Sequence, residues 1–286
     1  CTPNGNWEKP RRFRHWTDST ELATEEHNGA VMSNTTRLKD PASVAWNIAV
    51  VGSFLFLVYL PASDALFAKE EATNYLDLLA FLPTGIFYTL AVTVMGSAAA
   101  IFIGLLVGLA KLSDNRPVNI MACFYTEILR GVPLLVLLFY IYYALGEFLN
   151  IPAFAAAVLG FGFCYGAYMA DVFRAGIEAI PKEQGEAARS LGMTERRAMF
   201  HVILPQAMRT IIPAVGNQTL GMLKDTSLVS VLAITDILRV GNEYATKHFN
   251  YFETYTYVAL TYLMLTLLMS RFARRLEAQQ TRILAS

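Results

Sequence analysis

Charged side chains interrupt an otherwise apolar stretch in the C-terminal third of the chain. Lys224 and Asp225 are followed by Thr226 and Ser227, and all four lie in or at the end of an apolar run at about residues 210–234. Ionisable groups at membrane depth are costly and commonly line a path for a solute. Adjacent charges of opposite sign could bind the ammonium and the carboxylate of a zwitterionic solute. The alternative is a structural polar cluster where a helix breaks.

Two amide side chains precede this cluster in the same apolar run. Asn217 and Gln218 could hydrogen-bond to a neighbouring helix, which is common for polar residues inside membrane bundles. They could also contribute to the same path as the charged residues. We therefore treat the two amides and the four residues from Lys224 to Ser227 as one candidate substrate pathway.

The chain carries no sign of a catalytic, metal or nucleotide site. Its four histidines have no metal-ligand spacing, and its three cysteines form no Cys-x-x-Cys pair. The sequence contains no Gly-Lys dipeptide, so the phosphate-binding loop GxxxxGK[ST] is absent. We expect a non-catalytic chain without cofactors, and any ATP and magnesium used with it must be bound by a different polypeptide.

Composition places these residues in a membrane protein. Of 286 residues, 55% are hydrophobic and only 16% are charged, whereas soluble domains carry about 25% charged residues. The formal net charge is zero, which does not favour a nucleic-acid partner. The sequence therefore predicts an all-α membrane protein in contact with the lipid bilayer over much of its surface.

Six apolar segments approach the length of about 20 residues that a membrane-spanning helix needs. They cover about 44–60, 84–110, 132–149, 153–173, 210–234 and 256–272. Lysines and arginines concentrate in one set of connections and in the C-terminal tail, and the positive-inside rule places that set in the cytoplasm. Both termini are therefore expected to be cytoplasmic.

The N-terminal region divides into two predicted parts. Residues 1–42 are polar and mixed in charge, and we expect a disordered cytoplasmic tail. Met32 would be an ordinary start for a membrane protein, so residues 1–31 are interpreted as an upstream extension or as part of that tail. Residues 43–61 are expected to form an extra N-terminal transmembrane helix.

Two further patterns predict how the helices pack. Small residues recur every fourth position in the second predicted span and form one face that a neighbouring backbone could approach closely: Gly96, Ala100, Gly104 and Gly108. The amphipathic segment 119–130 precedes Gly131 and Pro133, which should break the helix. That segment either lies along the cytoplasmic interface or belongs to one long kinked helix.

A polar helical segment, EAARSLGMTERRAMFHVILP at 186–205, connects two apolar runs. Gly192 permits the positive φ that ends a helix, and Thr194 is a suitable N-cap for the next one. Pro205 is expected to restart the chain into the following span at a fixed angle. A helix–turn–helix of this kind could transmit a push from a partner protein to two membrane helices, whereas the alternative is a simple connector.

The same segment resembles the EAA loop of ABC importer permeases, and the motif positions are Glu186, Ala187, Ala188, Gly192, Val202, Leu204 and Pro205. Val202 stands where the family usually has Ile. The flanking segments, including TEILRGVPLLVLLFYIYYAL, DVFRAGIEAIPKEQGEAARSLGM and LKDTSL, look like the branch that takes up polar amino acids. Asp171 replaces the Glu common in that branch. The resemblance covers about residues 84–277.

The resemblance implies a type I ABC importer permease bundle, with a five-helix core over 84–277, a cytoplasmic coupling loop at 181–205 and the extra helix in front. It implies ATP-driven, binding-protein-dependent import of polar amino acids, with a glutamine-like substrate favoured, across the bacterial inner membrane. The implied partners are an ABC ATPase dimer, a second permease subunit that is the same or related, and a periplasmic amino-acid-binding protein. Glu186 is expected to contact the ATPase or to brace the loop.

A secondary transporter or channel for small polar solutes, working without an ATPase, is the alternative function. Such proteins commonly contain inverted repeats or paired broken helices, and the sequence shows no convincing internal repeat.

Overall fold

The computed structural model describes residues 48–56, 59 and 75–283, and every regular element in these ranges is helical. From α3 onward the elements belong to one compact unit, residues 49–286, whereas the unit of residues 1–48 lies almost entirely outside the described ranges. The α-helices are α3 (Tyr75–Lys111), α4 (Arg116–Gly131), α5 (Leu134–Phe139), α6 (Gly146–Leu149), α7 (Ala153–Glu178), α8 (Lys182–Ser190), α9 (Glu195–Ala198), α10 (Leu204–Asp225), α11 (Ile237–His248) and α12 (Tyr251–Ile283). Two π-helical segments, Tyr140–Leu145 and Met199–Ile203, and one 3₁₀ segment, Thr226–Leu232, join some of them.

Four helical runs within the described ranges are long and apolar enough to cross a membrane: Leu82–Lys111, Ala153–Glu178, Glu195–Leu232 and Tyr251–Arg275. They contain nearly all of the predicted spans at 84–110, 153–173, 210–234 and 256–272. The first predicted span is only partly described: residues 48–56 are helical, and the remainder of 43–61, like the predicted tail 1–42, lies almost wholly outside the described ranges.

The predicted span at 132–149 is not one straight helix. It consists of α5, a π-helical segment and α6, and it turns by 101° from α4. The cause is local: Val132 precedes a proline, which disfavours the α conformation, and it is extended at φ −93° and ψ 127°. The predicted break at Gly131 and Pro133 is therefore confirmed, and α4 with the bent stretch counts as a fifth candidate span only if the pair is taken together.

The predicted small-residue face of α3 packs directly against α7. A Cβ added at Gly104 would lie 2.6 Å from the Cβ of Met169, and one added at Gly96 would lie 3.1 Å from the Cβ of Phe161. At Gly108 the nearest atom would be 3.0 Å away, the carbonyl oxygen of a residue of α7. The glycines thus let the two helices approach closely, and the core extends from this contact to α10.

The substitution Gly104→Ala should therefore force α3 and α7 apart. Overpacking of a buried contact costs about 1–3 kcal/mol, and we expect the melting temperature of the purified protein to fall by several degrees. Gly131→Ala is the matched control, because an added Cβ there meets no heavy atom within 4 Å. Thermal denaturation in detergent measures both variants, and equal melting temperatures for the two would contradict the close α3–α7 contact.

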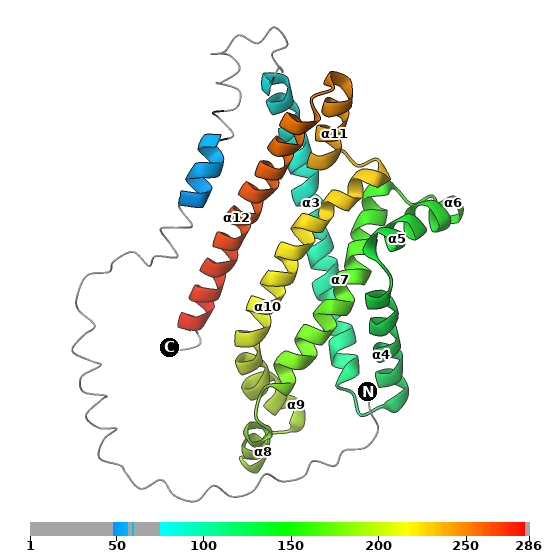
Figure 1. The fold of residues 1–286 in the computed structure, drawn as a ribbon. Helices are drawn as coiled ribbons and strands as arrows, with labels where there is room; N and C mark the ends of the chain where they lie inside the picture. The colour runs from blue at the N-terminus through cyan, green and yellow to red at the C-terminus, as the bar shows by residue number, and fades with distance from the viewer. Residues whose placement is uncertain (1–47, 57–58, 60–74, 284–286) are drawn as a thin grey trace, which may run out of the picture. The chain divides into compact units, whose positions relative to one another are not determined.

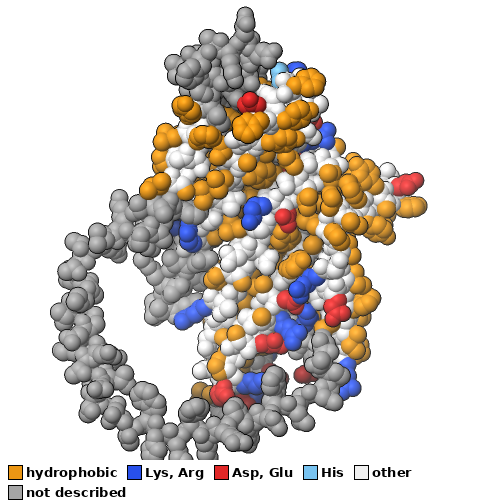
Figure 2. Space-filling view, in the orientation of Figure 1, with side chains coloured by type: hydrophobic (Ala, Val, Ile, Leu, Met, Phe, Trp, Pro, Cys, Tyr) orange, Lys and Arg blue, Asp and Glu red, His pale blue; other side chains and the backbone are white. Residues whose placement is uncertain are grey.

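The remaining helices define two opposite ends of the bundle. Figure 1 shows the α8–α9 loop at one end and α11 at the other, with α7 and α10 running between them. At the α11 end, a second core joins α3, α11 and α12 through Leu82, Ile237, Val240, Tyr244, Tyr257 and Val258. Apolar side chains cover much of the outer surface of the molecule in Figure 2, as expected for helices that face lipid.

Candidate functional site

The α8–α9 loop has the turn geometry that its sequence predicts. Gly192 has a φ of +82° and follows the end of α8. Its amide donates to the carbonyl of Arg189 at 2.9 Å, and the next amide donates to the carbonyl of Ala188 at 3.1 Å. This pair of bonds is a Schellman motif. The hydroxyl of Thr194 then accepts a hydrogen bond from the amide of Arg197 at 3.4 Å, so the predicted N-cap of α9 is confirmed.

The motif residues of the loop divide into an exposed and a buried group. Glu186, Ala187 and Gly192 are exposed, whereas Ala188 is only 4% exposed. A groove of about 510 Å³ lies between α8 and the run that begins with α9, and its lining includes Glu186 and Arg189. The loop therefore presents a charged, hollowed surface at one end of the bundle.

The structure corrects the role expected for Pro205. The chain does not restart there, because α9, the π-helical segment and α10 form one helical run from Glu195 onward. Leu204 and Pro205, the last two motif residues, are the first two residues of α10 and are half-buried. Proline has no N–H to donate, and the wider π-helical turn just before it accommodates that missing bond.

The candidate pathway residues lie on α10 and the segment after it. Asn217 and Lys224, seven positions apart, are both exposed on the same side of α10, and Gln218 is half-buried. Asp225, the last residue of α10, is exposed and accepts a hydrogen bond from the hydroxyl of Tyr165 at 2.7 Å. The α-helix ends here, and a 3₁₀ segment begins at the next residue.

The two hydroxyl residues after Asp225 point differently from the charged pair. Thr226 is fully buried, and its hydroxyl donates to the carbonyl of Leu223 at 2.6 Å. Ser227 is half-buried and donates to the carbonyl of Lys224 at 3.0 Å. Both hydroxyls therefore bond to the backbone at the end of α10.

A cluster of charges on three helices was not recognised as a unit from the sequence. Asp171 of α7 binds Lys111 of α3 at 2.6 Å and Arg130 of α4 at 2.5 Å. Lys111 also donates to the hydroxyl of Thr126 at 3.0 Å. In the sequence, this cluster is indicated only by charged residues of opposite sign in or near the predicted spans. Which of them form ion pairs depends on how the helices pack.

A second polar centre lies at the α11 end, between the candidate spans. Asp236 is fully buried and caps α11, accepting hydrogen bonds from the amides of Leu238 and Arg239, each at 3.1 Å. The hydroxyl of Tyr262 donates to the same carboxylate at 3.1 Å. Burial disfavours the anion and raises the pKa of Asp236 to about 6, although these hydrogen bonds act in the opposite direction.

This raised pKa predicts a pH-dependent stability. The folded state binds the Asp236 proton more tightly than the unfolded state, so the stabilising contribution is present at low pH and is lost as the pH rises through about 6. Between pH 5 and pH 7.5 the loss should be about 1.4 kcal/mol. Asp236→Asn keeps a capping oxygen without a charge, so the melting temperature of the wild type relative to this variant should fall by a few degrees over that range. A constant difference between them would contradict the prediction.

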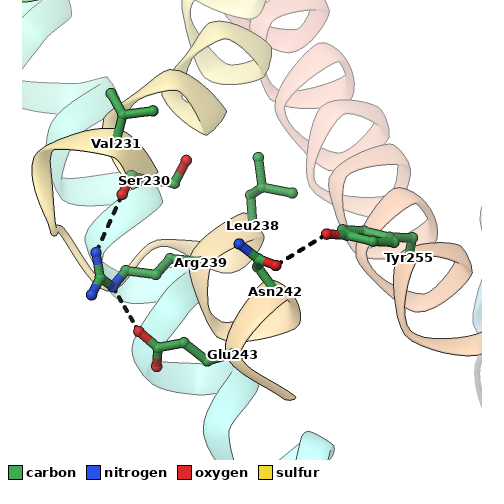
Figure 3. A pocket seen from close by; sticks show the side chains of 7 residues that line it. All are labelled: Ser230, Val231, Leu238, Arg239, Asn242, Glu243 and Tyr255. Atoms are coloured by element: carbon green, nitrogen blue, oxygen red, sulfur yellow. Dashed lines mark hydrogen bonds and ion pairs between the residues drawn. The ribbon is translucent and has the colours of Figure 1, made fainter. Parts of the chain in front are cut away.

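A cavity of about 360 Å³ lies beside this centre, lined by the 3₁₀ segment, α11 and Tyr255 of α12. Figure 3 shows the side chains that line it. In this cavity the guanidinium of Arg239 forms an ion pair with the carboxylate of Glu243 at 2.7 Å. The same guanidinium donates a hydrogen bond to the carbonyl of Ser230 at 3.3 Å. The hydroxyl of Tyr255 donates to Asn242 at 3.3 Å across the cavity. The α11 end thus presents polar groups held in defined positions.

Fold and site together define a polytopic membrane protein with an exposed polar loop at one end and charged residues on a helix within the bundle. A family model described as binding-protein-dependent transport system inner membrane component matches residues 100–282. The chain belongs to this family, and it is a multi-pass permease subunit of an ABC importer in the inner membrane, not an enzyme. A system of this kind includes a binding protein and an ATPase.

Two curated relatives illustrate the similarity. The L-cystine transport system permease protein of Bacillus subtilis (strain 168) is 34% identical over 206 residues, which cover 71% of this chain and 88% of the relative. The glutamine transport system permease protein of Escherichia coli (strain K12) is 37% identical over 192 residues, which cover 66% of this chain and 88% of the relative.

Two solved structures share the fold. The crystal structure of an amino acid ABC transporter with histidines contains a chain that is 38% identical, with a TM-score of 0.68, and the match covers 72% of this chain and 96% of that one. A chain of the MetNI methionine ABC transporter in an inward-facing conformation is 19% identical, with a TM-score of 0.64 and coverage of 71% and 98%. The second match supports the fold alone.

Proposed function

We propose that this chain, together with a second permease subunit of the same or a related sequence, encloses a path by which polar amino acids enter the cell. ATP binding and hydrolysis on two partner subunits drive the import, and a periplasmic binding protein delivers the substrate. The relatives named above transport cystine and glutamine, and the related structure is of an amino-acid transporter. A glutamine-like substrate is favoured.

The observation that carries this proposal is the exposed polar side of α10. Asn217, Lys224 and Asp225 are exposed in the isolated chain, although α10 belongs to a helical run that is long and apolar enough to span a membrane. Charged side chains do not face lipid at such depth unless they are paired or meet water. A water-filled path completed by a second subunit satisfies them, and the pair of opposite charges suits a zwitterionic amino acid.

The α8–α9 loop is the proposed contact with the ATPase. Its turn at Gly192 joins α8, which follows α7 after a short connection, to α9, which continues through the π-helical segment into α10. A push on the exposed side of α8, where Glu186 lies, is therefore passed to two membrane helices. The motif resemblance assigns the same role to Glu186, Ala187, Ala188, Gly192, Leu204 and Pro205.

The orientation follows from the distribution of basic residues. Arginines and lysines concentrate at the α8 end and in the C-terminal segment, so we place this end, the coupling loop at 181–205 and both termini in the cytoplasm. The α11 end then faces the periplasm and receives the binding protein. Residues 43–61 add an N-terminal membrane helix to the core at 84–277, and residues 1–42 form a polar cytoplasmic tail.

Reconstitution of the whole importer tests this function. The permease, its ATPase and its binding protein are placed in proteoliposomes, and uptake of each of the twenty amino acids is measured with and without ATP. We expect uptake of one or a few polar amino acids that requires all three components. Uptake that proceeds without the ATPase would instead favour a secondary transporter or channel, and no uptake of any amino acid would contradict the proposed substrate class.

A further inference from the structure

The charge cluster on α3, α4 and α7 is not electrically balanced. Asp171 lies between two cations, Lys111 at 2.6 Å and Arg130 at 2.5 Å. The side chain of Lys111 is only 6% exposed, so this buried ammonium needs the carboxylate as its counter-charge. Lys111 and Asp171 therefore neutralise each other, and the charge of Arg130 remains in excess.

Arg130 also differs from Lys111 in its surroundings. Half of its side chain is exposed, and its guanidinium lies 5.3 Å from the centre of the Tyr168 ring. A guanidinium has five N–H donors in a planar fork that fits a carboxylate. Asp171 accepts a hydrogen bond from only one guanidinium nitrogen of Arg130. The Tyr168 ring lies against one side of the guanidinium and helps to orient it.

Contacts along α7 connect Arg130 to the proposed path. Asp225 of α10 accepts a hydrogen bond from Tyr165, whose ring lies 6.1 Å from that of Tyr168. Tyr168 in turn lies beneath the guanidinium of Arg130. The two tyrosines are three residues apart, which corresponds to about 4.5 Å along the helix axis. Arg130 therefore lies about one helical turn closer to the α8 end of the bundle than Asp225 does.

Charged side chains also gather on the face of the molecule that carries α7 and α10. Figure 2 shows lysine or arginine and aspartate or glutamate side chains over the lower part of α7, with an apolar surface along one side of them. Within this part of α7, Asp171 is about one-third exposed. An exposed cation beside α7, a helix that spans the membrane, requires either water or an anion, not lipid.

From these contacts we propose that Arg130 is a carboxylate-binding residue of the translocation path, one step further toward the coupling loop than Lys224 and Asp225. Tyr168 is the positioning residue that holds its guanidinium toward the path, and Lys111 keeps Asp171 from neutralising it. The substrate class is an amino acid with a free α-carboxylate. This inference rests on the proposed function, which it deepens by naming the group that recognises the carboxylate.

The test compares two substitutions that each remove one partner of the ion pair. If the pair had only a structural role, both substitutions would have the same effect. Arg130→Gln and Asp171→Asn are introduced into the complete transporter in nanodiscs, without the binding protein. Equilibrium binding is measured for L-glutamine and for L-glutaminamide, which lacks the α-carboxylate. If the importer transports another amino acid faster, that amino acid and its α-amide replace this pair of probes.

We expect Arg130→Gln to weaken binding of L-glutamine at least tenfold and to leave binding of L-glutaminamide unchanged. Asp171→Asn should leave L-glutamine binding equal or tighter, because the guanidinium is then released from its protein partner. A variant that carries both substitutions is measured as well. If the two single variants and the double variant all lose the same affinity for L-glutamine, the ion pair only holds α4 against α7, and the proposal is overturned. An unchanged affinity for L-glutamine in Arg130→Gln would overturn it as well.

Two controls keep the result interpretable. Arg174→Gln removes an arginine of α7 that pairs with Glu178 at 3.0 Å, and this variant should bind both probes as the wild type does. If Arg130→Gln does not fold, Arg130→Lys keeps the charge but loses the fork, and binding of L-glutamine should weaken about threefold or more with the amide unaffected. Unchanged L-glutamine binding in Arg130→Lys would then overturn the proposal.

A wild type that imports no amino acid contradicts the proposed function itself, whereas normal import with normal carboxylate recognition in the Arg130 variant contradicts this inference alone.

Discussion

Replacing Asp225 with asparagine is expected to reduce amino-acid uptake at least tenfold while the protein folds and assembles normally. Asp225 lies exposed at the end of α10, and its carboxylate accepts one hydrogen bond from Tyr165, which leaves acceptor positions for a substrate ammonium. A hydrogen bond to a charged group contributes about 1.5–3 kcal/mol, which corresponds to a loss of about 10- to 150-fold. The amide of asparagine can still accept from Tyr165, so the variant removes the charge without removing the local contact.

The measurement is the initial rate of ATP-driven uptake into proteoliposomes over a range of concentrations of loaded binding protein. Ser227→Ala is the matched control, because the Ser227 hydroxyl bonds to the backbone of Lys224, and we expect its uptake to change less than twofold. Normal uptake by Asp225→Asn would remove the charged pair from the path and would leave Asp225 with a structural role.

Replacing Glu186 with lysine should separate ATP hydrolysis from transport. Glu186 is exposed on α8 and lines the groove next to α9, so its change of charge alters the proposed contact surface and not the packing of the bundle. A lost contact between charged groups of about 1.4 kcal/mol corresponds to a tenfold effect, and we expect at least that loss of uptake. ATP hydrolysis by the complex should no longer respond to the loaded binding protein.

The control for this variant lies one helical turn away. Glu183 is also an exposed acid of α8. Glu183→Lys carries the same change of charge, and we expect it to retain most of the uptake and the stimulation of ATP hydrolysis. Equal defects in the two variants would indicate a general electrostatic effect of the loop and would contradict a specific role of Glu186.

Local features of the fold could be predicted from the sequence because they depend on residues close together in the chain. Gly192 and Thr194 define the turn of the coupling loop by their own conformational and capping preferences, and both appear as expected. The glycines of α3 similarly predict a close helix contact, since only a small residue admits a neighbouring backbone.

Features that depend on distant parts of the chain could not be predicted. Val132 and Pro133 predict that the helix breaks after α4, but they do not predict the 101° angle of the bend. Asp171 lies 60 positions from Lys111 and 41 from Arg130, and their pairing requires the packing of α3 and α4 on α7. The continuous helix through Pro205 depends on a π-helical turn that hydrophobic patterning does not reveal.

The orientation of individual polar residues was also only partly predictable. Lys224 and Asp225 are exposed, as a path requires, whereas Thr226 is fully buried. The reason is helical spacing: Thr226 lies three and four positions after the buried Leu223 and Met222, on the same side of the helix. The candidate pathway therefore narrows to Asn217, Gln218, Lys224 and Asp225, with Tyr165 added from α7.

Cross-linking of the α8–α9 loop tests the central claim most directly. The native cysteines are replaced by serine, and a single cysteine is introduced at Ala187, which is exposed on α8, or at Asn242 on α11 as the control. The assembled transporter is then treated with a short thiol cross-linker, and its products are separated by size. The account predicts that Ala187→Cys forms a cross-linked product with the ATPase subunit and that Asn242→Cys does not. A cross-link to the ATPase from Asn242→Cys, or none from Ala187→Cys in a complex that hydrolyses ATP, would contradict it.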